Sequence, residues 1–297
     1  MSLQAALVVG CGYLGLRVAR RWLAAGRQVY AVTRWPQRAA ALAAEGLRPV
    51  LADVTVASSL ADLPPAETVL YAVGRDRQSP STAEAVYAKG LQAVLDRVAA
   101  NTPPPTRVLL ASSTGVYGDA AGGWVSESSP CRPEGPAARA MVAAEGVLHA
   151  HGLGPQAIVL RLAGLYGPGR LPKLADLLAG HPLPVDPEAV VNLIHVDDAA
   201  AAVLAAEAHA QAPGVYNIAD GHPVLRGEFY RYLAELLGCP APTFAPAAGA
   251  ASRDRGGSKR VDNRRMLEEL GVRLAYPTWS EGLAAIVAGL RSGGGTP

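Results

Sequence analysis

The sequence predicts an α/β fold, a doubly wound parallel sheet followed by a smaller carboxy-terminal lobe. Three observations lead to this prediction. Apolar runs of strand length alternate with helical patterns through the first half of the chain. A glycine-rich turn, GCGYLG at 10–15, joins the first run to the first helical pattern. After Gly164 the chain becomes rich in proline and glycine and its helical patterns become short.

The apolar runs predict at least six buried parallel strands, because they are nearly continuous rather than alternating. Helical patterns lie between them, and the clearest follow the glycine turn and Pro36, run from Ser81 to Ala100, and run from about Pro136 to Ala150. The predicted strands are ALVVG (6–10), QVYAVT (28–33), RPVLADV (48–54), ETVLYAVG (67–74), TRVLLASS (106–113) and PQAIVLRLAG (155–164).

These patterns divide the 297 residues into two parts. Residues 1–164 are expected to form a nucleotide-binding domain, and residues 165–297 to form mainly a substrate-binding lobe, with about 190–210 returning to the first domain. The helix DDAAAAVLAA in that returning stretch is expected to begin with an aspartate cap, and neighbouring His195 to pin a loop rather than bind metal.

Composition narrows the classes of function. The three cysteines are scattered, which argues against a disulfide framework or a zinc site and favours the cytoplasm. No apolar run reaches membrane-spanning length, and the start of the chain lacks the pattern of a signal peptide. A net charge of +2 argues against nucleic-acid binding, although the stretch SRDRGGSKRVDNRR (252–265) is basic. Nucleic acid and membranes are therefore not expected partners.

The glycine turn predicts a dinucleotide site of the Rossmann type. An apolar run leads into Gly10, and a helix with an apolar face follows, so Gly10 would make the turn, Gly12 would admit the pyrophosphate and Gly15 would let helix pack on strand. The expected cofactor loop is Gly10, Cys11, Gly12, Tyr13, Leu14 and Gly15.

The end of the second predicted strand points to the form of the cofactor. An acidic residue there would bind the ribose 2′-hydroxyl of NAD, but this position reads Thr33-Arg34, with Arg38 one helical turn further. Two guanidinium groups suit a 2′-phosphate, so NADP(H) is predicted, with NAD as second choice. The alternative that Arg34 is only a solvated arginine stays open.

Five segments in order resemble the extended short-chain dehydrogenase/reductases, which include nucleotide-sugar epimerases and dehydratases. They are ASSTGVYGD (111–119), LRLAGLYGPG (160–169), VNLIHVDDAAAAVLAA (191–206), GVYNIADGHPV (214–224) and SKRVDNRRMLEELGVRLAYPTWSEGL (258–283). The resemblance implies a Rossmann fold, places Asp53 near the adenine, and implies that Ala72, Val73 and Gly74 line the cofactor.

The same resemblance implies further site residues and an assembly. Ser113 takes the position of the family's catalytic Ser or Thr, with Thr114 beside it, and Lys259 and Arg260 become candidate contacts to a nucleotide-sugar diphosphate. A homodimer through two long helices of the sheet domain is also implied, with the helix from Ser81 to Ala100 as a contributor.

The family's catalytic Tyr-x-x-x-Lys is absent. None of the three lysines follows a tyrosine by four residues, and aligning the helix on Glu145 puts Ala137 at the Tyr position and Met141 at the Lys position. Arg139 could place a charge near the ribose but cannot exchange protons, because its pKa exceeds about 12. Tyr117 and Tyr166 lie in loops at the ends of strands and are candidate replacement acids.

Two functions follow. The first is an NADP(H)-binding oxidoreductase of epimerase/dehydratase type, acting by hydride transfer on a nucleotide sugar or similar substrate. The second is a catalytically inactive NADP(H)-binding sensor or regulatory protein, which the loss of both catalytic groups motivates. The oxidoreductase is the leading hypothesis and the sensor is the alternative.

Overall fold

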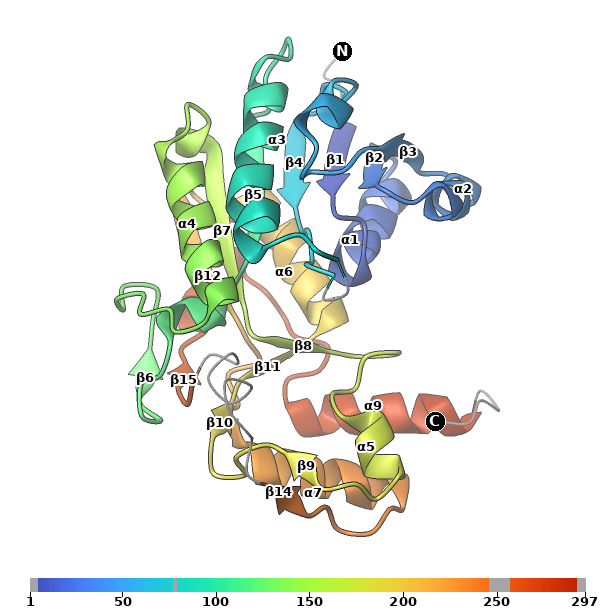
Figure 1. Cartoon of the computed structure of the whole chain (residues 1–297), viewed down its shortest axis with the longest axis vertical. Coiled ribbons are helices and arrows are strands. Elements are labelled where there is room, and N and C mark those ends of the chain that lie inside the picture. Colours follow the sequence, from blue (N-terminus) through green and yellow to red (C-terminus); the bar gives the residue numbers. More distant parts are fainter. Residues whose placement is uncertain (1–4, 77–78, 246–256, 293–297) are drawn as a thin grey trace.

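The computed structural model describes residues 5–76, 79–245 and 257–292 (Figure 1). Its centre is a seven-stranded sheet in the order β12-β7-β5-β4-β1-β2-β3, in which every neighbouring pair is parallel. This confirms the doubly wound parallel sheet. The strands are β1 (Ala5–Val9), β2 (Gln28–Thr33), β3 (Arg48–Leu51), β4 (Thr68–Tyr71), β5 (Arg107–Ser113), β7 (Ala157–Leu162) and β12 (Gly214–Ile218).

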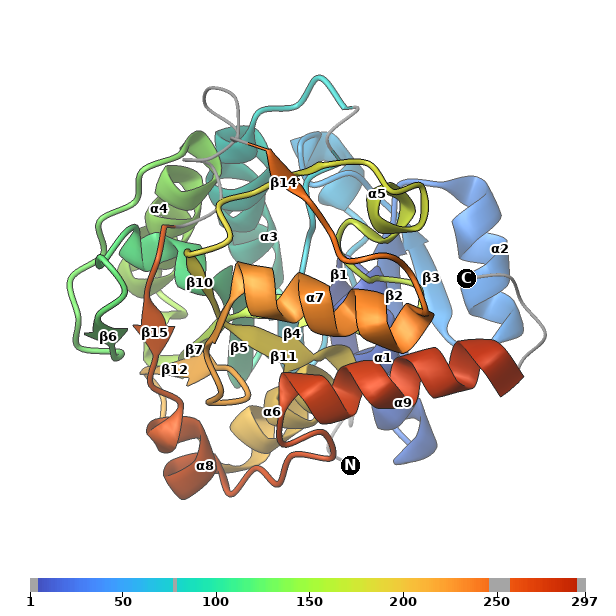
Figure 2. The same ribbon diagram turned by 90° about the horizontal axis from the view of Figure 1, so that it is seen from below.

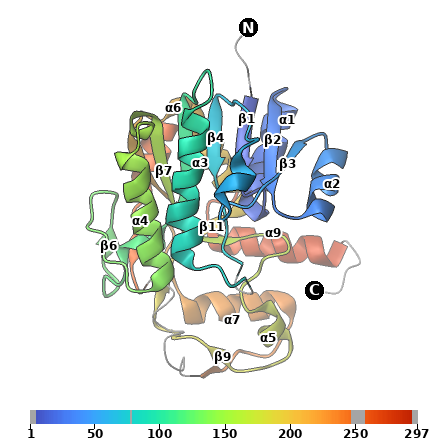
Figure 3. The same cartoon turned by 45° about the horizontal axis from the view of Figure 1, so that its top comes forward.

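The apolar runs form central strands because helices cover both faces of the sheet. All residues of β1 and β7 are buried. Helices α3 and α4 cover one face, and α1 and α6 pack together on the other (Figure 3). Helix α2 packs on β2 and β3 at one edge. These helices are α1 (Tyr13–Ala24), α2 (Pro36–Ala44), α3 (Gly90–Ala99), α4 (Pro136–Ala150) and α6 (Val196–His209).

The strand order reverses between β1 and β4, which are neighbours in the sheet although β2 and β3 lie between them in the chain. In open parallel sheets, such a reversal leaves a crevice at the carboxyl ends of the strands, and ligands bind there. The glycine turn follows β1 directly, so it lies at this crevice.

Helices α5 (Leu174–Leu178), α7 (Arg226–Leu237) and α9 (Trp279–Ser292) form a lobe below the carboxyl ends of the strands (Figure 1). Its own hydrophobic cluster contains Phe229, Leu233 and Leu283, and α7 and α9 run side by side in it (Figure 2). Helix α8 (Arg264–Leu270) belongs to the sheet domain instead, because it packs on α6 and β12 and its Met266 and Leu270 join the main core.

Four short strand pairs tie distant segments together: β8 with β11, β9 with β14, β10 with β13, and β6 with β15. The last pair brings Arg260 opposite Trp124. Their bounds are β6 (Trp124–Val125), β8 (Gly164–Tyr166), β9 (Leu183–Pro184), β10 (Val190–Val191), β11 (Leu193–His195), β13 (Val224–Leu225), β14 (Phe244–Ala245) and β15 (Arg260–Val261). Single turns occur at η1 (Ala57–Leu60), η2 (Ala85–Lys89), η3 (Thr114–Tyr117) and η4 (Gly154–Gln156).

Two local expectations are corrected. The helix expected from Ser81 to Ala100 contains the π-helical turn η2 before α3. Helix α6 is capped by His195, whose Nδ1 accepts a hydrogen bond from the backbone N–H of Asp197, so the cap is not an aspartate. Residues 252–256 of the basic stretch lie outside the described residues.

Candidate active site

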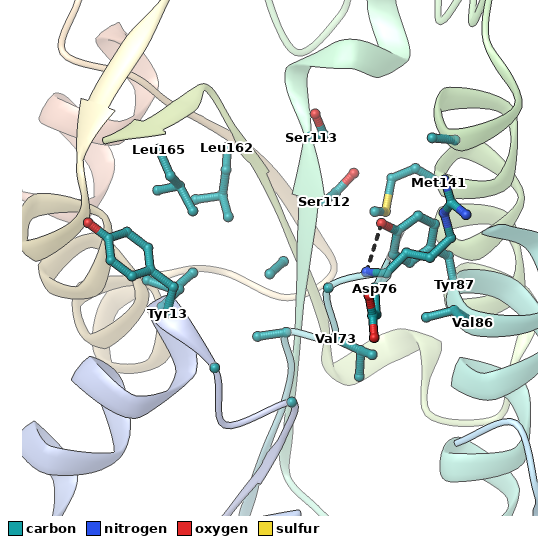
Figure 4. A pocket seen from close by; sticks show the side chains of 18 of the residues that line it. Tyr13, Val73, Asp76, Val86, Tyr87, Ser112, Ser113, Met141, Leu162 and Leu165 are labelled. Atoms are coloured by element: carbon teal, nitrogen blue, oxygen red, sulfur yellow. Dashed lines mark hydrogen bonds between the residues drawn. The ribbon is translucent and has the colours of Figure 1, made fainter. Parts of the chain in front are cut away.

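A cavity of about 1220 Å³ lies between the carboxyl ends of the strands and the lobe (Figure 4). Its walls come from the segments that follow β1 to β5 and β7, and from the lobe residues Val190, Asn192, Arg226 and Lys259. Sites for drug-sized ligands usually measure about 300–1,000 Å³. This cavity therefore has room for a dinucleotide together with a second small molecule.

The glycine turn has the geometry of a dinucleotide cradle. Gly10 has a φ of +94°, and a Cβ on it would lie 2.6 Å from the backbone of Ala72. A Cβ on Gly15 would lie 2.4 Å from the carbonyl oxygen of Gly10, so only glycine lets α1 approach the turn this closely. Gly12 is different, because a Cβ there would meet nothing within 4 Å. The open space faces the cavity, at the amino end of α1 where a phosphate is stabilised.

Five of the six residues of the predicted cofactor loop line the cavity, and the exception is Gly15, which packs behind the turn. The Cys11 side chain is buried, which raises the pKa of its thiol to about 11. Tyr13 lies at the far side of the turn and donates a hydrogen bond to the carbonyl oxygen of Pro168, 3.1 Å away (Figure 4). The cofactor turn is thereby linked to a loop that follows β8.

The residues after β2, β3 and β4 form the other end of the cavity. Thr33, Arg34, Arg38 and Asp53 all line it, as do Ala72, Val73 and Gly74. The Arg34 guanidinium lies 2.9 Å from the Asp76 carboxylate and 3.9 Å from that of Asp53. Burial raises the pKa of Asp53, but hydrogen bonds from Thr55 and the charge of Arg34 outweigh burial and lower it.

Trp35 is a residue at this end that the sequence reasoning missed. Its side chain is 56% exposed, and the Arg34 guanidinium stacks over its ring, 4.9 Å from the centroid. A tryptophan directly after a predicted cofactor arginine was the signal available in the sequence.

Ser113 and Thr114 line the cavity at the end of β5. The Ser113 hydroxyl oxygen accepts a hydrogen bond from the backbone N–H of Gly115 at 3.1 Å, which fixes the oxygen and leaves its proton to point elsewhere. Ser112 also lines the cavity, but it donates to the Glu145 carboxylate at 2.5 Å. Of the two serine hydroxyls, that of Ser113 is the better placed to donate to a ligand in the cavity.

The helix expected to carry the catalytic pair presents an apolar wall. Ala137, Ala138 and Met141 of α4 line the cavity. Arg139 lies on the same helix, but its side chain is exposed and donates to the backbone carbonyl of Glu134, outside the cavity wall.

Tyr117 and Tyr166 do not line the cavity. The buried Tyr117 hydroxyl donates to Asn217 at 2.6 Å and accepts from Arg161 at 3.0 Å. Tyr166 is fully buried against His195, and its hydroxyl has no hydrogen-bond partner among the described residues. Burial raises the pKa of both phenols. The fold therefore places these two candidate acids behind the wall instead of in it.

Arg161 and Glu145 explain the environment of Tyr117. Their side chains form a buried ion pair 2.7 Å apart, and Arg161 also reaches the Tyr117 oxygen. The network joins β7, α4 and η3 behind the cavity wall, so Glu145 has a structural partner in this chain.

Lys259 and Arg260 were both predicted to contact the substrate, but only Lys259 lines the cavity. Lys259 lines the cavity, is 4% exposed, and donates to the carbonyl oxygen of Gly118 at 3.0 Å. Burial lowers its pKa to about 8. Arg260 instead donates to the carbonyl of Gly122 and is not in the cavity wall. Arg170 and Arg226 line the cavity and were not anticipated.

Tyr87 is a further cavity residue that the sequence did not predict. It lies in η2 and lines the cavity beside Met141 (Figure 4). A tyrosine within a predicted long helix carries no sequence signal for this role, because the helix pattern does not show the π-helical turn.

Over the described ranges, no helix is long and apolar enough to cross a membrane. Within the same ranges, no group of three or more His, Cys, Asp or Glu side chains could hold a metal ion.

The sequence profile of the NAD-dependent epimerase/dehydratase family matches residues 6–219, well over half of the chain. The chain belongs to this family. Protein YeeZ of Escherichia coli K12 is 33% identical over 276 residues, which cover 91% of this chain and 95% of YeeZ. A 3-diazoavenalumate denitrifying reductase from a Streptomyces species is 32% identical over 142 residues, covering 42% of this chain and 45% of the reductase.

Solved structures share the architecture over nearly the whole chain. A conserved protein from Silicibacter pomeroyi is 32% identical, with a TM-score of 0.80, and the match covers 96% of this chain and 98% of that chain. The dTDP-glucose 4,6-dehydratase DesIV of Streptomyces venezuelae, solved with NAD and TYD, has a TM-score of 0.81 over 97% of both chains. At 24% identity, DesIV supports the fold alone. The NAD(P)-binding oxidoreductase fold is therefore established for this chain.

Proposed function

We propose that this chain binds NADP(H) and acts as an epimerase/dehydratase-like oxidoreductase, transferring a hydride to or from a carbinol or carbonyl carbon of a nucleotide sugar or similar substrate. The observation that carries this proposal is the single cavity that joins the glycine turn and Arg34 to Ser113 and Lys259. A protein that only stored a nucleotide would not need a substrate side to its cavity.

The residues present fit a bound dinucleotide. Gly12 and the amino end of α1 would hold the diphosphate, and Ala72 to Gly74 would lie along the cofactor. Arg34 and Arg38 would pair with the 2′-phosphate, which requires Arg34 to exchange its contact with Asp76 for the phosphate. The bound nicotinamide would supply or accept the hydride. Ser113 would orient the substrate oxygen.

The charges on the lobe side favour an anionic substrate. Lys259, Arg226 and Arg170 line the cavity there, and the diphosphate of a nucleotide sugar would meet these cations. Family structures of the same fold are named for such substrates, including dTDP-glucose 4,6-dehydratase and UDP-glucose 4-epimerase. A cytoplasmic location and a homodimer that uses α3 stay predictions.

The Arg34→Ala variant tests the cofactor prediction. Wild-type protein is expected to bind NADPH more tightly than NADH, and Arg34→Ala to lose roughly 10- to 100-fold in NADPH affinity, since charge-assisted hydrogen bonds contribute about 1.5–3 kcal/mol. NADH affinity should change little. Calorimetric titration of both cofactors measures this.

The exposed Arg273, which does not line the cavity, provides the matched control variant Arg273→Ala. Equal affinities for NADPH and NADH in the wild type would refute the NADP(H) preference. Absence of binding by either cofactor would refute the oxidoreductase function itself.

One observation favours a second function, a cofactor-binding sensor without turnover. Ala137 and Met141, at the expected positions of the catalytic pair, give α4 an apolar face in the cavity. Such a protein would bind NADPH without oxidising it in the presence of sugar-nucleotide, carbonyl or enone substrates. Turnover that is lost in Ser113→Ala would exclude this function.

A further inference from the structure

Tyr87 is a phenol in the wall of the cavity. Its ring lies beside Met141, and its hydroxyl points into the cavity on the side of Ser112 and Ser113 (Figure 4). The turn that carries it packs directly on α4. Tyr87 thus brings a hydroxyl from η2 to the wall where α4 offers only Ala137 and Met141.

The π-helical turn fixes this position. One wider turn, Ala85–Lys89, interrupts the helix and rotates its side chains, and such turns occur frequently at functional sites. The Tyr71 hydroxyl donates to the carbonyl oxygen of Val86, the residue before Tyr87, and this contact is buried. A Cβ on Gly90 would lie 2.9 Å from the same Tyr71 oxygen, so the packing below the turn is tight.

The hydrogen bonds in the wall show which phenolic proton is available. Tyr13, the other phenol that lines the cavity, donates its proton to Pro168. The Tyr87 oxygen instead accepts a hydrogen bond from the backbone N–H of Arg75 at 3.3 Å. Over the described ranges no acceptor is recorded for its proton, so the proton can pass to a ligand.

We propose that Tyr87 is a catalytic residue that donates a proton to the substrate oxygen during hydride transfer; this inference rests on the proposed function. In reduction, the substrate carbonyl carbon gains a hydride from NADPH, and the electrons of the C=O π bond move to oxygen. The O–H bond of Tyr87 breaks as its proton forms a bond to that oxygen. NADP⁺ and a phenolate remain, and water returns the proton to the phenolate.

The surroundings of Tyr87 suit both states of the phenol. The backbone N–H of Arg75 would stabilise the phenolate oxygen, and the Arg75 side chain also lines the cavity. The half-buried ring leaves a route for water to reprotonate the oxygen. Oxidation of a substrate alcohol would use the same groups in the reverse direction.

Fluorine NMR tests the contact independently of turnover. Protein labelled with 3-fluorotyrosine is compared with labelled Tyr87→Phe, and the resonance that disappears belongs to Tyr87. This resonance is expected to shift when saturating NADP⁺ is added. The resonance of Tyr232, which packs on Trp279 in the lobe, serves as the control and should stay in place. A Tyr87 resonance that does not move with bound NADP⁺ would overturn the proposal.

Reduction of nitrobenzaldehyde by NADPH tests the proton transfer. Tyr87→Phe is expected to lower kcat by about 10²-fold or more, the usual contribution of a general acid, with NADPH affinity unchanged because the ring remains. Tyr232→Phe is the matched control. Equal turnover by wild type and Tyr87→Phe would refute the role of Tyr87 alone. Failure of the wild type to bind NADPH would refute the proposed function, and with it this inference.

Discussion

At the scale of single residues, Lys259 is a buried lysine whose charged form is less stable in the folded protein than in the unfolded chain. Burial holds its pKa at about 8, below the ordinary value of 10.5. Between these two pH values the unfolded chain binds more protons at this position than the folded chain. The free energy of unfolding should therefore rise as the pH increases from about 8 to 10.5, since deprotonation costs the folded state less.

Urea unfolding of wild type and Lys259→Met across this range checks the expectation. The difference in unfolding free energy between the two proteins should grow in favour of the wild type as the pH rises through the window, and should be constant below about 8. Parallel curves above pH 8 would show that Lys259 keeps its ordinary pKa in the folded protein.

The sequence predicted which residues at strand ends would reach the cavity more successfully than it predicted where each polar side chain would point. Thr33, Arg34 and Asp53 reach the cavity because the ends of parallel strands meet at one edge of the sheet. Tyr117 and Arg260 both lie in segments that resemble the family. Their side chains nevertheless donate hydrogen bonds away from the cavity, Tyr117 to Asn217 and Arg260 to the carbonyl oxygen of Gly122. Such choices depend on partners a hundred or more residues away, which a local pattern does not contain.

At the scale of elements, two glycines at the junction of β1 and α1 have different roles. Gly15 serves the packing of α1 on the turn, and Gly12 is expected to serve the binding of the cofactor. A Cβ on Gly15 would approach the Gly10 carbonyl oxygen to 2.4 Å, so Gly15→Ala should push α1 from the turn and destabilise the protein by about 1–3 kcal/mol. A Cβ on Gly12 meets nothing within 4 Å. Gly12→Ala should therefore keep the thermal stability of the wild type and still weaken NADPH binding by filling the cradle.

Thermal unfolding with calorimetric NADPH titration distinguishes the two variants. Gly15→Ala is expected to lower both Tm and affinity, and Gly12→Ala affinity alone. If Gly12→Ala binds NADPH as the wild type does, the diphosphate does not approach the turn at this residue.

Element prediction succeeded where one periodic pattern was decisive. Helix α4 spans the expected Pro136–Ala150. The prediction of one uninterrupted helix from Ser81 to Ala100 was wrong in detail, because the π-helical turn η2 precedes α3 and leaves the apolar period almost unchanged. The seventh sheet strand, β12, was not counted among the predicted strands, because its run is short and lies in a region rich in proline and glycine.

At the scale of the whole molecule, the cavity requires both the sheet and the lobe, and Asp220 lies where they meet. It follows β12 and is 3% exposed. The lobe helix α9 begins at Trp279, whose backbone N–H lowers the pKa of Asp220, as does that of His222. Burial is the larger influence, assisted by the nearby Asp198, and raises this pKa from 3.8 to about 7.

The raised pKa gives a definite pH dependence for the joint between sheet and lobe. Between pH 3.8 and about 7 the folded protein holds a proton on Asp220 that the unfolded chain has released. The contribution of Asp220 to the free energy of unfolding should therefore fall as the pH rises through this window. In Asp220→Asn, which keeps an acceptor oxygen for the same backbone groups but does not titrate, this contribution disappears. Urea unfolding of both proteins at a series of pH values should show the wild type losing stability relative to Asp220→Asn toward neutral pH; a constant difference would mean that the carboxylate is already ionised inside the fold.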